Sequence, residues 1–240
     1  MRGVGTPREP LSLRTALRIV HRDARWWLHC LGYGAIATSF FGLPLVAGFV
    51  IESYDNSKRG FPTPLPPWVD LSTRYLAGIF ALVIDFTFFA LPGLIGGVLT
   101  FCAGLALALA LGGVAGVQIF FLVAAGLLFC MLVALFMLSV SPVGRLRFAD
   151  EGRIEDALSG ETLRYALSRT KRANFLRARL YSLVAYLPAL ALLGVGVRLS
   201  SINFAAQGLI LLVLWWLFCS AVVYAHLVVV QLYVAAEAAS

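Results

Sequence analysis

The feature that most constrains this chain is an apolar stretch that runs from Tyr75 to Val143. Asp85 is the one charged side chain among its 69 residues. A soluble core needs no apolar run of that length, whereas a bilayer crossed by helices of about 20 residues does. The whole chain agrees, because 60% of its 240 residues are hydrophobic and 13% are charged. This composition excludes a secreted disulfide scaffold, a disordered chain, a nucleic-acid module and a soluble enzyme.

The apolar runs predict an all-α integral membrane protein with about six transmembrane helices. A cytoplasmic arm at 1–27 precedes a single polytopic domain at 28–240. The expected spans are 28–51, 75–94, 96–113, 117–141, 180–197 and 203–235. Pro44 removes a backbone hydrogen bond in the first span, so a broken or re-entrant segment is the alternative there. Within the long run, the chain is expected to turn at Leu91-Pro92-Gly93 and at Gly112-Gly113.

The basic residues predict the orientation. The formal charge is +7, and the Lys and Arg residues concentrate in the N-terminal arm and in the segment 143–179. Because Lys and Arg are enriched on the cytoplasmic side of a membrane, both regions are expected there. An even number of spans must then separate them. Six spans place both termini in the cytoplasm and make 143–179 a second cytoplasmic helical segment.

The N-terminal arm is amphipathic. On a helical wheel Leu13, Leu17 and Val20 share one face with Ala24 and Trp27. The basic stripe opposite consists of Arg14, Arg18, Arg22 and Arg25. One interpretation is an interfacial helix whose arginines contact anionic lipid headgroups. The other is a helix that packs on the protein's own cytoplasmic face.

Three stretches carry a resemblance to a known family. The first runs through Gly48-Phe49-Val50-Ile51, Gly60-Phe61-Pro62 and Leu65-Pro66-Pro67-Trp68-Val69-Asp70. The second is Pro142-Val143-Gly144-Arg145-Leu146-Arg147-Phe148-Ala149-Asp150-Glu151-Gly152-Arg153-Ile154, and the third is Val223-Tyr224-Ala225-His226-Leu227. Together they resemble the uncharacterised multi-spanning membrane family known as domain of unknown function 4013. The resemblance implies several helical passes through a prokaryotic cytoplasmic membrane, and it carries over no catalytic residue.

Asp85, Gln118 and His226 are the candidate functional residues inside predicted spans. A carboxylate near mid-membrane costs about 2.5–3.5 kcal/mol on insertion scales, so Asp85 is expected to face the bundle interior or a wet cavity. It either binds a cation or proton, or joins helices through hydrogen bonds, with Thr87 and Gln118 as expected partners. His226 either titrates near neutral pH or bonds to a neighbouring helix.

Small residues are expected to pack the helices. Gly93 and Gly97 form one small-xxx-small pair, and Gly112 and Gly116 form another. The four cysteines have no metal-ligand spacing and are expected to be buried free thiols. No nucleotide-binding, hydrolase or metalloprotease motif occurs, so no cofactor or metal is expected.

Three classes of function remain. The first is a non-enzymatic accessory or scaffold subunit that packs against other membrane proteins or against itself. The second is a small transporter or channel that uses Asp85, favoured by prolines that interrupt predicted helices. The third is a membrane enzyme acting on lipid, for which the sequence offers little. The absence of catalytic motifs favours the first.

Overall fold

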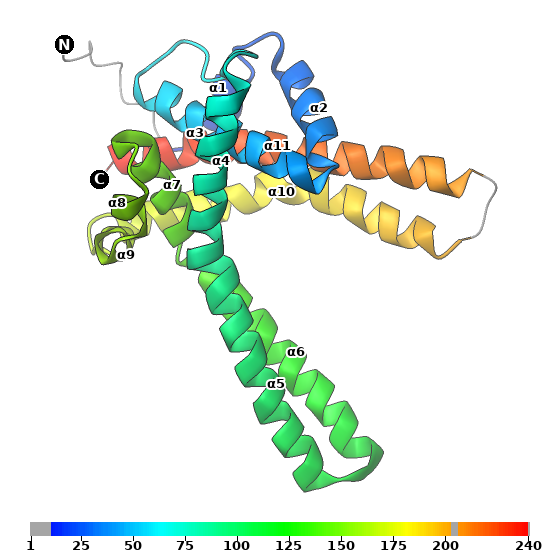
Figure 1. Cartoon of the computed structure of the whole chain (residues 1–240). Coiled ribbons are helices and arrows are strands. Elements are labelled where there is room, and N and C mark those ends of the chain that lie inside the picture. The colour runs from blue at the N-terminus through cyan, green and yellow to red at the C-terminus, as the bar shows by residue number, and fades with distance from the viewer. Residues whose placement is uncertain (1–10, 203–205, 240) are drawn as a thin grey trace.

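The computed structural model describes residues 11–202 and 206–239, and these residues are helical with no strand. Figure 1 shows a central body from which two helical hairpins extend in different directions. The body contains both ends of the described chain. Four helical segments are long and apolar enough to cross a membrane: Leu71–Leu111, Gly116–Glu151, Arg172–Ser200 and Gln207–Ala238. Six spans were expected, and the difference arises in two places.

The first difference lies in the hairpin at the bottom of Figure 1. Helix α4 (Leu71–Asp85), a π turn (Phe86–Ala90) and α5 (Leu91–Leu111) follow one another without a break. The expected spans 75–94 and 96–113 are therefore one helix, and the turn expected at Leu91-Pro92-Gly93 is wrong. The π turn, in which the N–H of Leu91 bonds to the carbonyl of Phe86, adapts the backbone just before Pro92, which lacks an N–H.

The hairpin turns instead at the second expected place. Gly112 and Gly113 have positive φ angles of 65° and 62°, a conformation that glycine adopts without a steric penalty. Helix α6 (Gly113–Met137) then returns beside α5 and ends four residues before the expected boundary at 141. A left-handed Ser139 separates it from α7 (Val140–Glu151). At 1.5 Å per residue, the 41-residue helix is about twice as long as the roughly 30 Å hydrocarbon core.

The second difference concerns the predicted first span at 28–51. It is broken into α2 (Trp26–Ala37), a 3₁₀ turn (Phe40–Gly42) and α3 (Leu43–Lys58), as the alternative expectation allowed. The hydroxyl of Ser39 accepts a hydrogen bond from the N–H of Gly42 at 3.2 Å, and Pro44 suits the first turn of the new helix. At about 18 and 24 Å, both helices are shorter than the hydrocarbon core.

The second hairpin matches the expectation of two spans. Helix α10 (Arg172–Ser200) contains Pro188 and pairs along its length with α11 (Gln207–Ala238). The first residues of the expected span 203–235 lie outside the described part of the chain. The basic segment 143–179 is helical, as predicted, and is divided among α7, α8 (Ile154–Leu158), α9 (Gly160–Ala166) and the start of α10.

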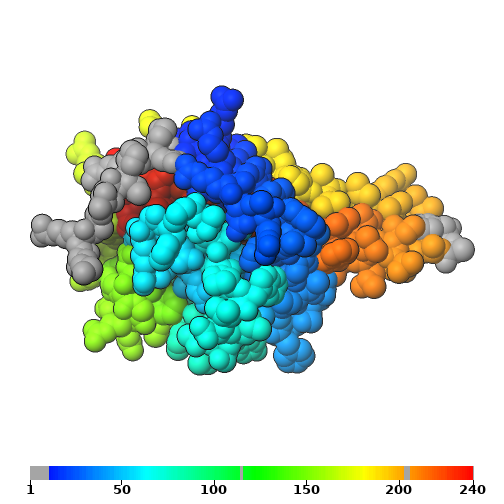
Figure 2. All heavy atoms as spheres, turned by 90° about the horizontal axis from the view of Figure 1, so that it is seen from above, coloured from blue at the N-terminus to red at the C-terminus, as the bar shows by residue number. Residues whose placement is uncertain are grey.

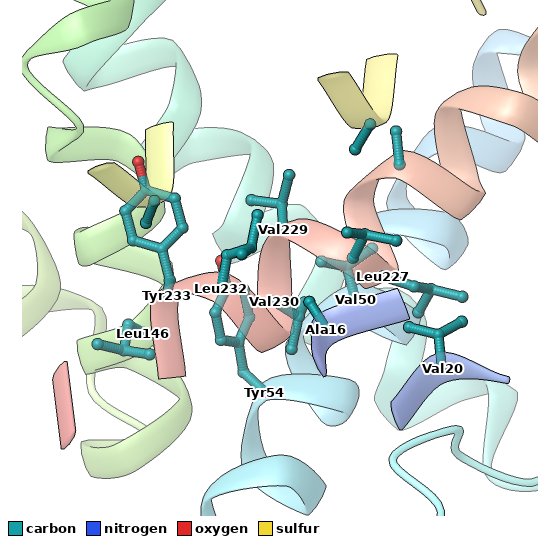
Figure 3. Close-up of a cluster of buried hydrophobic side chains, with 14 of the residues drawn as sticks. Ala16, Val20, Val50, Tyr54, Leu146, Leu227, Val229, Val230, Leu232 and Tyr233 are labelled. Atoms are coloured by element: carbon teal, nitrogen blue, oxygen red, sulfur yellow. The ribbon is translucent and has the colours of Figure 1, made fainter. Parts of the chain in front are cut away.

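The C-terminal half of α11 forms the centre of the body. Figure 3 shows its buried residues Leu227, Val230 and Leu232 beside side chains from α1 (Leu13–Val20), α3 and α7. Seen from above in Figure 2, the N-terminal helices and the segment around α3 cover this face of the body, and the α10–α11 hairpin extends beyond them. One helix thus belongs both to the core and to a candidate span.

Helix α1 is shorter than the amphipathic pattern suggested, because it ends at Val20 and α2 begins at Trp26. Ala16 and Val20 are buried in the main core, and Leu13 and Leu17 pack against it. Of the two interpretations, these contacts favour a helix that packs on the protein itself, and the contact of the arginines with lipid headgroups stays a prediction. Of the four basic residues, Arg14 and Arg18 lie exposed on α1, and Arg22 and Arg25 lie exposed after it.

Glycines set the closest helix crossings, although not at the expected pairs. A Cβ at Gly78 of α4 would overlap the carbonyl oxygen of Pro44, and one at Gly48 of α3 would overlap that of Arg74. By contrast, a Cβ at Gly93 or Gly97 would make ordinary contacts of 3.4 and 3.8 Å with α6. The tightest crossing is therefore α3 on α4 in the body, where glycine allows the backbones to touch.

Candidate functional site

Asp85 is paired with a cation from a distant part of the chain. Its Oδ1 accepts a hydrogen bond from Nε of Arg145 at 2.9 Å, and its Oδ2 forms an ion pair with Nη2 of the same side chain. Ser141 also donates its hydroxyl proton to Oδ1. Arg145 and Ser141 lie one turn apart on one face of α7. This two-point pairing fixes α4 against α7 where the first hairpin meets the body.

The partners predicted for Asp85 are wrong. The hydroxyl of Thr87 donates to the carbonyl of Val83 at 2.8 Å, within its own helix. Gln118 lies exposed near the start of α6, at the end of the hairpin that is far from the body. The structure thus separates Gln118 from the other polar candidates, whereas it brings Asp85 and His226 to one place.

That place is a polar cavity of about 220 Å³ between α3, α4, α7, α10 and α11. The polar or charged side chains that line it are Tyr54, Asp85, Ser141, Arg145, Arg179, Tyr186 and His226. Apolar residues such as Val50, Phe89 and Val229 complete the wall. The cavity joins groups from both hairpins, and its lining includes two arginines and one carboxylate. We take it as the candidate functional site.

Arg179 is the cation in this cavity that lacks an acidic partner among the described residues. Its side chain is 7% exposed. Nε donates to the carbonyl of Phe136 at 2.6 Å, and the guanidinium carbon lies 3.6 Å from the centroid of the Phe136 ring. These contacts leave the four N–H groups of the two terminal nitrogens for other acceptors. With Arg145 neutralised by Asp85, the lining carries one excess positive charge.

The neutral polar groups of the cavity are ordered by hydrogen bonds. His226 places Nδ1 2.9 Å from the carbonyl of Val222 and Nε2 3.5 Å from the hydroxyl of Tyr186. This is the structural arrangement anticipated for His226, a ring bonded to a neighbouring helix. On α3, burial raises the pKa of the Tyr54 hydroxyl, which keeps the group neutral and able to donate.

Sequence reasoning missed both arginines of the cavity because it counted them within a basic segment. A helical spacing could have found them. Arg179, Ser182 and Tyr186 recur at three- and four-residue intervals, so they share one face of α10. Ser141 and Arg145 share a face of α7 in the same way. Neither pattern, however, says which helix the face meets.

A second buried cation, Arg74, holds the proline-rich loop. Its side chain is 1% exposed. Nη2 bonds to Oε2 of Glu52 at 2.6 Å and to the carbonyl of Pro67 at 2.8 Å, and Nη1 bonds to the hydroxyl of Tyr33. The Tyr33 ring stacks on Trp68 with centroids 4.3 Å apart. Pro67 and Trp68, from the first stretch that carries the family resemblance, are thus held in place by side chains outside that stretch.

The glycines and cysteines have mixed environments. Gly93 and Gly97 line an open groove between α5 and α6, whereas Gly112 forms the turn and Gly116 lies against α5. Cys30 and Cys219 are buried as expected, but Cys102 and Cys130 are exposed on the first hairpin. Among the described residues, no group of three or more His, Cys, Asp or Glu side chains is placed to hold a metal ion.

Long apolar helices that extend from a charged body are the features of a helical integral membrane protein. The comparisons with known proteins agree. The family model described as "Protein of unknown function (DUF4013)" matches residues 31–199, well over half of the chain, and the chain belongs to that family. The match confirms the resemblance seen in the sequence. No curated protein and no solved structure matches the chain.

Proposed function

We propose that this protein is a non-enzymatic accessory or scaffold subunit of a membrane complex. The observation that carries the proposal is an apolar groove of about 580 Å³ along the α5–α6 hairpin. Its lining residues include Phe89, Gly93, Leu94, Gly97, Phe101, Leu128 and Leu132. No helix of the described chain covers it. A protein helix from a partner, or from a second copy, suits such a groove.

The glycines favour a protein occupant over lipid chains alone. Helices associate in bilayers largely through close packing, which small residues allow. In the most apolar stretch of α6, none of the residues is buried within the chain. The first hairpin therefore has two helices and no third to pack against them. A partner helix over Gly93 and Gly97 would complete a three-helix arrangement.

Purification in a gentle detergent, followed by mass spectrometry, tests this role. We expect a stoichiometric membrane partner or a homo-oligomer with the unaltered chain. Gly97→Leu, which fills the groove, should remove it. Gly126→Leu is the matched control, since a Cβ at Gly126 of α6 meets open space. A monomer from the unaltered chain, or equal assembly by both variants, would refute the proposal.

For topology we propose four spans in a prokaryotic cytoplasmic membrane, with both termini inside. The α2–α3 segment then stays on the cytoplasmic side without crossing. This arrangement is supported by the basic residues of the described chain, because the arm from residue 11 to 27, Lys58, Arg59 and the segment 143–179 all belong to the body from which the hairpins extend. The exposed side chains of Arg14, Arg18, Arg22 and Arg25 then lie on the side where anionic headgroups would contact them. Reporter fusions at Gly112 and after Ser240 should give opposite locations.

A small transporter is the second candidate, and the polar cavity favours it. Asp85 and His226 meet there beside two arginines, at the junction of the two hairpins. In a transporter, neutralising Asp85 should abolish flux in proteoliposomes while the protein stays folded. A scaffold would show no flux in the unaltered chain. Asp85→Asn alone would also leave Arg145 without its counter-ion. The double variant Asp85→Asn/Arg145→Gln is therefore the better probe.

A further inference from the structure

The polar cavity adjoins a second cavity of opposite character. This second cavity has a volume of about 470 Å³ and lies between α2, α3, α4 and α11. Its apolar wall includes Ala37, Val46, Leu82, Trp215, Phe218 and Val222. Val50, Arg145 and His226 line both cavities. The polar and apolar cavities therefore meet at Arg145 and His226. The volume of the apolar cavity lies within the range of roughly 300–1,000 Å³ typical of small-molecule sites.

The polar cavity carries an excess positive charge, which favours an anionic ligand. Asp85 satisfies Arg145 through two oxygens, and among the described residues no carboxylate forms an ion pair with Arg179. A buried guanidinium without a counter-ion is costly. Its planar fork matches the oxygens of a phosphate or a carboxylate. The hydroxyls of Tyr54 and Tyr186 line the same space and add neutral donors.

The apolar side is reached from the surface of a candidate span. Phe40, at the tip between α2 and α3, is 82% exposed, and Trp215 on α11 is 46% exposed. Both line the apolar cavity. Trp215 lies within Gln207–Ala238, one of the four segments long and apolar enough to cross a bilayer. A hydrocarbon chain can therefore enter from the bilayer without crossing water.

We propose that the two cavities together bind one anionic phospholipid. The phosphodiester group accepts hydrogen bonds from Arg179 at the polar end, and an acyl chain fills the apolar cavity past Arg145 and His226. A free inorganic anion would leave the apolar space empty. A zwitterionic lipid would add its own cation beside a site that already has one excess positive charge. The site shares Phe89 with the α5–α6 groove, but it does not depend on a protein partner.

Native mass spectrometry of the delipidated full-length chain tests the headgroup. We expect phosphatidylglycerol to bind at least tenfold more tightly than phosphatidylcholine of the same chains. Arg179→Gln should reduce phosphatidylglycerol binding about tenfold or more, because it removes charge-assisted hydrogen bonds. Arg177→Gln is the control, since Arg177 carries the same charge on the same helix but lies exposed. No preference for phosphatidylglycerol, or equal binding by the two variants, would overturn the proposal.

A second pair of variants tests the acyl chain and stands even if Arg179→Gln does not fold. Ala37→Trp, at the end of α2, places an indole in the apolar cavity and should weaken binding of phosphatidylglycerol severalfold. Ala35→Trp is exposed on the same helix and outside the cavity lining, so it should bind as the unaltered chain does. Glycerol phosphate, which lacks the chain, should not displace the lipid at millimolar concentration. Equal binding by the tryptophan variants, or displacement by glycerol phosphate, would overturn the proposal.

Discussion

The two hairpins of this protein have the same secondary structure and opposite relations to the body. In the most apolar stretch of α11, 22% of the residues are buried within the chain, whereas none is buried in that of α6. Helix α11 continues into the centre of the body, where Leu227, Val230 and Leu232 are fully buried. Helices α5 and α6 extend away from the body (Figure 1). The second hairpin is thus part of the core, and the first is attached to it.

The attachment of the first hairpin depends on a few specific contacts. Helix α4 carries the helical path from the body into α5, and it is held by the close crossing at Gly48 and Gly78 and by the Asp85–Arg145 pair. The second hairpin relies on many apolar contacts instead. Single substitutions should therefore damage the attachment of the first hairpin far more than they damage its extended part. Three predictions test this difference.

The largest effect is expected at Asp85. Asp85→Asn leaves the guanidinium of Arg145 largely buried without its counter-ion, and removing one partner of a buried pair costs about 3–5 kcal/mol. The double variant Asp85→Asn/Arg145→Gln should recover most of this loss, because it does not leave Arg145 charged without a counter-ion. Thermal unfolding in detergent measures both. Asp55→Asn, in an exposed pair with Arg59, should cost only about 0.3–0.5 kcal/mol.

If Asp85→Asn is as stable as the unaltered chain, the ion pair does not anchor the hairpin. The double variant also separates the two candidate functions, since it removes the carboxylate together with the guanidinium that the carboxylate neutralises. Flux that disappears in a stable double variant would favour the transporter over the scaffold.

A smaller effect should distinguish two glycines placed on either side of the attachment. Gly78→Ala puts a methyl group against the carbonyl oxygen of Pro44, and overpacking of this kind costs about 1–3 kcal/mol. Gly126→Ala meets open space on α6 and should be neutral or slightly stabilising, since alanine has the higher helix propensity. Unfolding midpoints in one detergent compare the two. Equal midpoints would mean that the α3–α4 crossing adapts easily.

The smallest effect is expected at a charged clamp on the body surface. Lys58 of α3 pairs with Asp150 of α7 and, at 2.7 Å, with Glu237 of α11. Because these groups are partly exposed, Lys58→Met should cost about 0.2–1 kcal/mol, and the loss should shrink as salt screens the charges. Unfolding midpoints at low and high ionic strength measure this. A loss that does not change with salt would assign the effect to the packing of the Lys58 side chain.

The sequence predicted correctly those features that depend on local composition. A long apolar run favours a membrane helix, because each of its residues contributes separately to the free energy of transfer into the bilayer. This is why the α10–α11 hairpin, the turn at Gly112-Gly113 and the helical basic segment were found. The amphipathic face of Leu13, Leu17 and Val20 was also detected. The pattern shows that this face is covered, but it does not say whether lipid or protein covers it.

The features that the sequence could not predict depend on contacts between distant residues. Pro92 can end a helix or follow a π turn. The outcome depends on whether the backbone before it can form the hydrogen bond of the π turn. Whether 28–51 crosses the membrane depends on the packing of α3 on α4.

Taken by itself, the sequence determined that the chain is a helical membrane protein of the DUF4013 family with its charges gathered in two blocks. The tertiary structure alone decided that Asp85 meets Arg145, 60 residues away, and that Arg179 has no acidic partner among the described residues. The free energy of transferring a segment into the bilayer is a sum over its residues, so it can be estimated from the sequence. The pairing of buried charges is set by which helices meet, and no local pattern encodes that.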